Sequence, residues 1–369
     1  MNQQAEAFIQ QKRLVETFLA LVRVDSPSGH EAKLSDALVK ELIKLDGDPH
    51  QDEIGNIVAY FKGNGSDDTV MLCAHMDTVG NDVGIQPIVL SDRITSDGTT
   101  ILGADDKSGI AVILEILKVF KEHPEISHPA LEVVLTVQEE VGLVGSSYLD
   151  KSQLKAKWGL VLDSGGRIGG ITVSGPTSRR YTFTILGKAA HAAVAPEQGI
   201  NAIQAAALGI TKCPCGKVDP EVVIGIGVIQ GGIATNIVPD KVEVKAMIRS
   251  RNPEKLERFS EQMENSFREG CEPFGAKSEA EKSDSYQGYL LDENSVPWQK
   301  TKKAAELLGF PFFTEHSLGG TDCNHFNQAG IPCCSVSTGM ANEHMKDEYI
   351  RIQDLYDAAR HVITAITIA

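Results

Sequence analysis

Several stretches of the chain place histidine or carboxylate side chains, the groups that bind divalent metals, next to apolar segments. The first is 69–78, where His75 and Asp77 come at the end of a run rich in Val, Met and Leu. Residues two apart on a strand point to the same side, so both side chains would reach one edge of a sheet. A carboxylate beside a histidine can orient a metal-bound imidazole. Alone, such a pair is more often part of a turn or a local hydrogen bond, so a metal site needs further groups.

Later stretches supply such groups, each next to an apolar segment. They are Asp105 and Asp106 before 110–120, Glu139 and Glu140 after 131–137, Asp163 after 158–162, and His344 after 331–337. The carboxyl ends of parallel strands lie along one edge of an open α/β sheet, where ligands bind. The repeated pattern therefore predicts that these side chains gather at one edge and form a metal site.

Each stretch also has a simpler interpretation. The two aspartates could cap the apolar helix expected at 110–120, because Asp is favoured at a helix start. The glutamate pair could be a solvated acidic turn. His325 is an alternative to His344, but it falls in an expected helix at 322–328 and is interpreted as a packing or surface residue. The phosphate-loop pattern is not met near 103–109.

Composition limits the class of protein and its partners. A chain of 369 residues with 42% hydrophobic and 23% charged residues is typical of a soluble globular protein with two domains. The net charge of −15 disfavours nucleic acid and anionic membranes as partners. The chain lacks both a signal-peptide pattern at its N-terminus and an apolar run of the roughly 20 residues that span a membrane. We therefore expect a cytoplasmic protein with reduced cysteines, in which Cys213 and Cys215 lack the second pair that a zinc knuckle needs.

Alternating helical and strand patterns predict an α/β fold with a mixed central sheet flanked by helices. One amphipathic helix is expected over 5–22 and another over about 31–45. The pattern changes over 176–288, which is expected to be a smaller inserted α+β domain. Because the last histidine of the site follows this insertion, the first domain should be discontinuous, comprising 1–175 and 289–369. Two such domains would leave a cleft between them.

Taken together, the motifs resemble those of the dinuclear zinc exopeptidase family that includes peptidase T, carboxypeptidase G and the acetylornithine and succinyl-diaminopimelate deacylases. They follow the family's order along nearly the whole chain. The matching segments are His75-x-Asp77, 103–107, Glu139-Glu140, Asp163, Gly187-x-x-x-His191, 234–240 and His344. The sequences of segments 97–107 and 319–322 most resemble those of the peptidase T branch.

The resemblance implies a role for each matching residue in a pair of metal sites. His75 and Asp163 would hold one metal ion, and Glu140 and His344 would hold the other. Asp105 would bridge the two ions. It is chosen over Asp106 because the family's bridging Asp stands two residues before a lysine, here Lys107.

Two further groups of residues would serve catalysis and substrate binding. Glu139 would act as general base, and Asp77 would steady the imidazole of His75. His191 would reach the substrate from the inserted domain, which acts as a lid and dimerisation domain in relatives. Asn236 and Arg249 resemble substrate-binding positions, although Arg249 could equally be a surface ion-pair residue.

These residues together lead us to expect a metal-dependent enzyme. Three ligating carboxylates and two divalent ions leave a net charge of about +1, which favours a metal-activated hydroxide. The ligands suit two Zn²⁺ ions, with Co²⁺ or Mn²⁺ as alternatives. The expected function is hydrolysis of short peptides from the N-terminus, as by a tripeptidase, and a homodimer is a further expectation. An N-acyl amino-acid deacylase or carboxypeptidase is the alternative, and an inactive peptide-binding scaffold is disfavoured by the full set of ligands and base.

Overall fold

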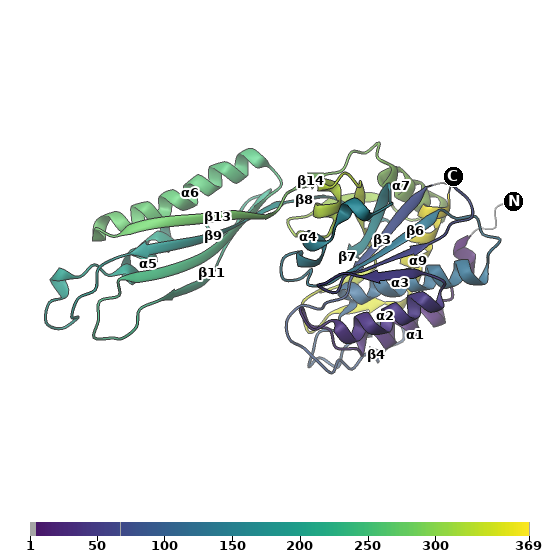
Figure 1. The fold of residues 1–369 in the computed structure, drawn as a ribbon, viewed down its shortest axis with the longest axis horizontal. Coiled ribbons are helices and arrows are strands. Elements are labelled where there is room, and N and C mark those ends of the chain that lie inside the picture. The colour runs from purple at the N-terminus through teal and green to yellow at the C-terminus, as the bar shows by residue number, and fades with distance from the viewer. Residues whose placement is uncertain (1–4, 67, 369) are drawn as a thin grey trace. The chain divides into compact units, whose positions relative to one another are not determined.

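The computed structural model describes residues 5–66 and 68–368, which form two compact units. Unit 1 comprises Met1–Ser174, Leu290–Ser317 and Thr321–Ala369, and unit 2 comprises Gly175–Tyr289 and Leu318–Gly320. Unit 1 is thus built from segments on both sides of unit 2 in the sequence (Figure 1).

The centre of unit 1 is a nine-stranded sheet with the order β1-β2-β6-β3-β7-β16-β8-β14, to which β15 is added next to β8. Its strands are β1 (Asp48–Gln51), β2 (Ile57–Phe61), β3 (Thr69–His75), β6 (Ala130–Thr136), β7 (Trp158–Ser164), β8 (Gly170–Gly175), β14 (Tyr289–Leu290), β15 (Phe313–His316) and β16 (Cys333–Ser337). β3 is parallel to β6 and β7, and β7 is parallel to β16, whereas β2 runs antiparallel to β6. Every residue of β3 and β6 is buried, as apolar strands covered on both faces should be.

Helices cover both faces of this sheet (Figure 1). α3 packs against β3 and β7, and α1 and α9 pack against α3. The helices of unit 1 are α1 (Gln11–Val22), α2 (Ala32–Lys44), α3 (Ala104–Glu122), α4 (Val144–Tyr148), α7 (Val296–Leu308), α8 (Cys323–Gln328) and α9 (Ile352–Thr367), with short 3-10 turns η1 (Ala5–Phe8) and η2 (Lys151–Gln153). The mixed α/β fold expected from the sequence is confirmed.

The helix expected over 5–22 is interrupted. The chain forms η1 and then α1, and Gln10 between them is extended (φ −101°, ψ 99°). Its backbone N–H donates to Glu115 Oε1 of α3 at 2.8 Å. The contact with this buried carboxylate occupies the N–H group and fixes the break, which periodicity alone did not reveal.

A small second sheet in unit 1 has the order β17-β18-β5-β4. Its strands are β4 (Ile88–Val89), β5 (Arg93–Thr95), β17 (Met340–Ala341) and β18 (Tyr349–Arg351). Antiparallel pairing of β18 with β5 joins the C-terminal loop 342–348 to the segment that precedes α3. Two stretches that are far apart in the sequence are thereby fixed side by side.

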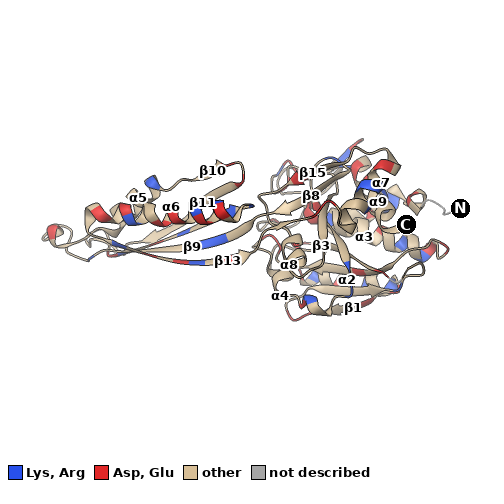
Figure 2. Ribbon diagram, turned by 90° about the horizontal axis from the view of Figure 1, so that it is seen from above, with Lys and Arg blue, Asp and Glu red and all other residues tan. Residues whose placement is uncertain are grey.

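Unit 2 is a five-stranded antiparallel sheet with two helices. Its sheet has the order β10-β11-β12-β9-β13, formed by β9 (Thr177–Leu186), β10 (Gly216–Asp219), β11 (Val222–Gly231), β12 (Lys241–Ser250) and β13 (Lys277–Tyr286). Both helices, α5 (Ala202–Lys212) and α6 (Pro253–Cys271), lie on the same face of the sheet (Figure 2), and the turns η3 (Pro196–Gln198) and η4 (Glu272–Phe274) complete the unit. Phe183 of β9 and Phe267 of α6 stack with ring centroids 4.1 Å apart in its own core.

Candidate metal centre

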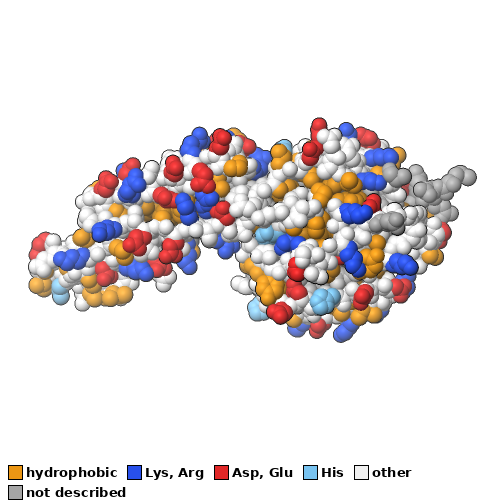
Figure 3. Space-filling model, turned by 45° about the horizontal axis from the view of Figure 1, so that its top comes forward, with side chains coloured by type: hydrophobic (Ala, Val, Ile, Leu, Met, Phe, Trp, Pro, Cys, Tyr) orange, Lys and Arg blue, Asp and Glu red, His pale blue; other side chains and the backbone are white. Residues whose placement is uncertain are grey.

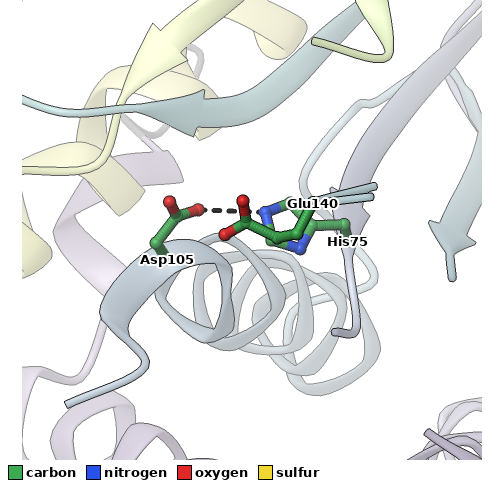
Figure 4. Close-up of side chains that lie close together, drawn as sticks. All are labelled: His75, Asp105 and Glu140. Carbon is green, nitrogen blue, oxygen red and sulfur yellow. Dashed lines mark hydrogen bonds and ion pairs between the residues drawn. The ribbon is translucent and has the colours of Figure 1, made fainter. Parts of the chain in front are cut away.

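Three parallel strands deliver side chains to one edge of the sheet in unit 1. His75 is the last residue of β3, Asp163 lies near the end of β7, and Glu139 and Glu140 follow β6. Because these strands run parallel, their carboxyl ends share an edge. Asp105 joins them from the start of α3 (Figure 4).

The two oxygens of the Asp105 carboxylate face two different histidines. Oδ1 lies 2.9 Å from His75 Nε2, and Oδ2 lies 3.1 Å from His344 Nε2. His344 Nε2 also lies 3.0 Å from Glu140 Oε1, and His75 Nε2 lies 3.9 Å from Asp163 Oδ1. Asp105 thus lies between a group containing His75 and Asp163 and a group containing His344 and Glu140, where its two oxygens could contact two separate ions.

The donor set fits metal ions. Possible ligand atoms of His75, Asp105 and Glu140 all lie within 4.8 Å of one another, and so do those of His75, Asp106 and Asp163. Glu140 Oε1 is buried, and the imidazole of His344 contacts it as an ion pair without a well-aligned hydrogen bond among the described residues. A buried carboxylate oxygen of this kind is stabilised by a cation.

The electrostatics of the cluster also favour added positive charge. Burial raises the pKa of Asp163 well above its usual value, and the negative charge of Asp105 adds to the shift. Burial would likewise raise the pKa of Asp105, but hydrogen bonds from His344 and His75 outweigh it and lower that pKa. Asp105 and Glu140 together raise the pKa of His344 to about 10. The carboxylates thus outnumber the cationic groups among them, and divalent ions would balance the charge.

Asp106 has the role of a capping residue. Its Oδ1 accepts the N–H of Gly109 at 3.1 Å in the first turn of α3, and its Oδ2 accepts the N–H of His75 at 3.2 Å. Both oxygens are therefore occupied by backbone donors. Asp105 has both of its oxygens directed towards the cluster instead, as Figure 4 shows for the side facing His75.

The environment of His75 and Asp77 differs in one respect from the expected pairing. His75 Nδ1 lies 2.9 Å from the backbone carbonyl of Asp77 and 3.4 Å from its carboxylate. Since a carbonyl only accepts, Nδ1 carries a proton, and Nε2 is the ring nitrogen that faces Asp105 and would bind a metal. The Asp77 carboxylate accepts the N–H groups of Glu139 at 2.9 Å and Glu140 at 3.2 Å, and the hydroxyl of Ser28 at 2.7 Å. Asp77 therefore fixes the glutamate pair as much as the imidazole.

Glu139 lies beside the cluster and is buried, with 8% of its surface exposed. Burial raises its pKa well above the usual value, and although His75 opposes the shift, the charges of Asp322 and Glu140 add to it. A carboxyl group with a raised pKa next to possible metal ligands is a candidate to accept and release a proton during a reaction.

Glu348 is a part of the site that sequence reasoning missed. Its Oε2 accepts the N–H groups of Leu102 and Gly103, both at 2.8 Å, and its Oε1 accepts the N–H of Asp105 at 3.1 Å. Burial raises the pKa of Glu348 to about 7. It thereby holds the loop that presents Asp105. The only signal in the sequence was an acid four residues after His344, within a run that reads as a charged loop.

His325 is buried in α8. Its Nδ1 lies 2.8 Å from the hydroxyl of Ser146. The neighbouring Asp322 is also buried and accepts the hydroxyl of Thr136 at 2.6 Å. These contacts agree with the interpretation of His325 as a packing residue.

The expected substrate-binding residues lie in unit 2. His191 is exposed, and its Nδ1 accepts the N–H groups of Ala193 and Val194 at 3.2 Å. The carbonyl of Asn236 accepts the N–H of Ala192 at 3.0 Å, so the loops that carry His191 and Asn236 are joined.

Arg249, on β12, is held differently from a surface ion-pair residue. Its guanidinium lies 6.0 Å from the ring centroid of Tyr286, and its Nη1 donates to the carbonyl of Leu318 at 3.5 Å. Its Nε is buried without a hydrogen-bond partner among the described residues. The alternative of a surface ion pair gains no support from these contacts.

Comparison with known proteins gives two family matches and close relatives. Residues 56–205 match the family described as Peptidase family M28, and residues 177–274 match the Peptidase dimerisation domain. The protein YqjE of Bacillus subtilis, described as uncharacterised, is 38% identical over 366 residues, covering 97% of this chain and 98% of the relative.

Two solved structures are similar over nearly the whole chain. A tripeptidase from Staphylococcus aureus has a TM-score of 0.90 at 35% identity, covering 98% of both chains. The aminopeptidase PepT from Bacillus cereus has a TM-score of 0.86 at 37% identity, covering 98% of this chain and 99% of the other. The chain therefore belongs to the peptidase T-like members of the M20 family and is a metal-dependent peptidase of the aminopeptidase type.

Proposed function

We propose that this peptidase removes the N-terminal residue from short peptides, tripeptides among them, with two zinc ions per chain. His75 and Asp163 would hold one ion, His344 and Glu140 the other, and Asp105 both. The observation that carries the proposal is the division of the Asp105 carboxylate between His75 and His344, at 2.9 and 3.1 Å.

The ligand types support zinc. Imidazole nitrogen and carboxylate oxygen without thiolate suit Zn²⁺, and Co²⁺ or Mn²⁺ could occupy the same set. Two such ions polarise a scissile carbonyl and lower the pKa of water. The Nδ1–H of His75 donates to the Asp77 carbonyl, which directs Nε2 to the cluster and fixes the ring.

Glu139 is proposed as general base. It would take the proton from the attacking water and pass it to the leaving amine, which requires a carboxylate that is not itself a ligand. The Asp77 carboxylate supports this role, because it fixes the backbone N–H groups of both Glu139 and Glu140. Glu139 could then accept the proton while Glu140 binds the metal ion.

The inserted unit is proposed as the domain that contributes to substrate binding and dimerisation. His191, Asn236 and Arg249 are the residues we assign to the substrate. For dimerisation, β10 pairs only with the first residues of β11, so 225–231 have β12 as their one neighbour among the described strands. This edge is uncharged, whereas the opposite edge strand, β13, carries charges along its length. Unprotected apolar edges favour strand pairing with a second chain.

We also propose a cytoplasmic location and short peptides as substrates, with neither nucleic acid nor a membrane as a partner. Among the described residues, no helix combines the length and apolar character needed to cross a membrane. On the face drawn in Figure 3, Lys and Arg side chains alternate with Asp and Glu, without the continuous basic surface that nucleic acid favours.

Product analysis by mass spectrometry tests the function. The enzyme, reconstituted with zinc or cobalt, is offered free tripeptides, N-acetylated peptides, C-amidated peptides and N-acyl amino acids. We expect release of the first residue from every peptide with a free N-terminus, including the C-amidated ones. Cleavage confined to N-acylated substrates would assign the chain to the deacylase branch. Cleavage that requires a free C-terminus would assign it to the carboxypeptidase branch. A chelator-treated sample is the matched control.

A further inference from the structure

An enzyme that acts on free N-termini must recognise an ammonium group very close to the reacting carbonyl. Standard backbone geometry places the α-nitrogen roughly 2.5 Å from the carbonyl carbon of the same residue. A group that binds this ammonium must therefore lie beside the metal ligands. The ligand carboxylates are assigned to the ions and Glu139 to the proton, so a further anion is needed.

Most acids around the centre have their oxygens engaged already. Asp77 and Asp106 accept backbone N–H groups on both oxygens. Glu348 is held by three backbone N–H groups. Asp322 is buried with 1% exposure; its Oδ2 accepts the hydroxyl of Thr136, and its Oδ1 has no hydrogen-bond partner among the described residues. The first three acids are thus held by backbone donors, and burial closes Asp322 off from solvent.

Glu343 is different. It directly precedes His344 in the loop between β17 and β18 and is half-buried. Among the described residues, no Lys, Arg or His forms an ion pair with its carboxylate. Burial raises the pKa of Glu343, its own backbone N–H opposes the shift, the charge of Asp105 adds to it and that of His344 opposes it. Its place next to His344 in the chain puts it beside a proposed metal ligand.

The position of this carboxylate is shaped by a glycine. A Cβ added at Gly165 would lie 2.9 Å from Glu343 Cδ and would collide with Oε1. Gly165 stands two residues after Asp163, so the Glu343 carboxylate packs over the loop that leads away from one proposed ligand. The absent side chain at 165 leaves the room that this carboxylate occupies.

We propose that the Glu343 carboxylate binds the free α-ammonium group of the substrate and selects peptides with an unblocked N-terminus. The inference rests on the proposed aminopeptidase function and adds the residue that distinguishes a free from a blocked N-terminus. The loop 342–348 then has two functions. His344 contributes a metal ligand, and Glu343 contributes the counter-charge for the substrate.

Glu343→Gln tests the inference with a pair of substrates that differ only in the α-amino group, a free tripeptide and its des-amino analogue. We expect kcat/KM for the free tripeptide to fall about 10- to 100-fold, because a charge-assisted hydrogen bond is lost. For the des-amino analogue, kcat/KM should be the same in the variant as in the wild type. Where turnover of the analogue is too slow to measure, its inhibition constant should be the same instead. Bound metal should stay at two ions per chain.

Asp347→Asn is the matched control on the same loop. Its exposed carboxylate accepts from Asn342 Nδ2 at 2.8 Å, and its replacement should change neither substrate. Equal losses on both substrates in Glu343→Gln, or an unchanged rate on the free tripeptide, would overturn the inference. Failure of the wild-type enzyme to cleave any free tripeptide would overturn the proposed function instead, and the inference with it.

Discussion

His344 Nε2 lies 3.1 Å from Asp105 Oδ2, although the two residues are 239 positions apart in the sequence. Two independent connections bring them together. β18 pairs with β5 shortly before Asp105, and Glu348 accepts backbone N–H groups from the loop that leads to it. The centre is therefore completed only when the C-terminal segment has joined the sheet edge formed by the first part of the chain.

The first prediction concerns the choice between two histidines. His344→Ala should reduce bound metal from two ions to one per chain, measured by elemental analysis after dialysis, because it removes a proposed ligand. His325→Ala is the control, since the Nδ1 of that histidine lies 2.8 Å from the hydroxyl of Ser146, whereas His344 Nε2 lies 3.1 Å from Asp105 Oδ2. Two ions retained in His344→Ala would exclude it as a ligand. One ion lost in His325→Ala would point to that residue instead.

The second prediction separates the glutamate pair. Glu139→Gln should keep both metal ions but lower kcat about 10²- to 10⁴-fold, because the variant cannot accept the proton of the attacking water. Glu140→Gln should instead lose metal, because it removes a proposed ligand. Steady-state kinetics and metal analysis on the two variants check this. Full activity in Glu139→Gln would be incompatible with the general-base assignment.

The third prediction concerns Glu348, which contacts backbone N–H groups around Asp105. Glu348→Gln should weaken metal affinity about 10- to 100-fold, the usual effect of removing a group that positions a ligand. Excess metal should restore most of kcat, because the ligands themselves are intact. The control is Asp347→Asn, which leaves these N–H contacts unchanged. An unaltered dissociation constant in a competition titration with a chelator would show that the loop is positioned without Glu348.

Sequence patterns predicted the elements of this site better than its internal connections. His75, Asp163 and the glutamate pair follow apolar strands, and such strands can be recognised from Val, Leu and Ile runs without knowledge of their partners. The parallel arrangement of β3, β6 and β7 then brings the strand ends together. The grouping of these residues could be predicted from the sequence, because it depends on local apolar patterns and on the rule that the carboxyl ends of parallel strands share one edge of a sheet.

The parts that were missed depend on tertiary contacts. Glu348 reads as one acid among several in a loop, and only the pairing of β18 with β5 gives it backbone partners. Strand β13 consists largely of polar and charged residues, because it is an exposed edge strand, so it lacks the alternating apolar pattern of a half-buried strand. The break at Gln10 likewise depends on Glu115, more than 100 residues away.

The fourth prediction links metal binding to pH. With Asp105 and Glu140 raising its pKa to about 10, His344 carries a proton at neutral pH before metal binds. A metal ion must displace that proton, so the affinity for metal should increase as the pH is raised towards about 10. Calorimetry in buffers of different ionisation enthalpy measures the protons released. His344→Ala should release about one proton fewer per chain.

The last prediction concerns assembly through the inserted unit. The edge of β11 at 225–231 lacks an outer partner strand among the described residues and carries Ile226, Val228 and Ile229 without any charge. A second copy pairing along this edge would extend the sheet, and lysines on an edge strand oppose such pairing. The double variant Val228→Lys/Ile229→Lys should therefore be monomeric when the wild-type chain is dimeric, as measured by light scattering coupled to gel filtration. Ala280→Lys, on the charged edge strand β13, is the control and should leave the mass unchanged. A dimer that persists in the β11 variant but dissociates in the β13 variant would place the interface on the opposite edge of the sheet.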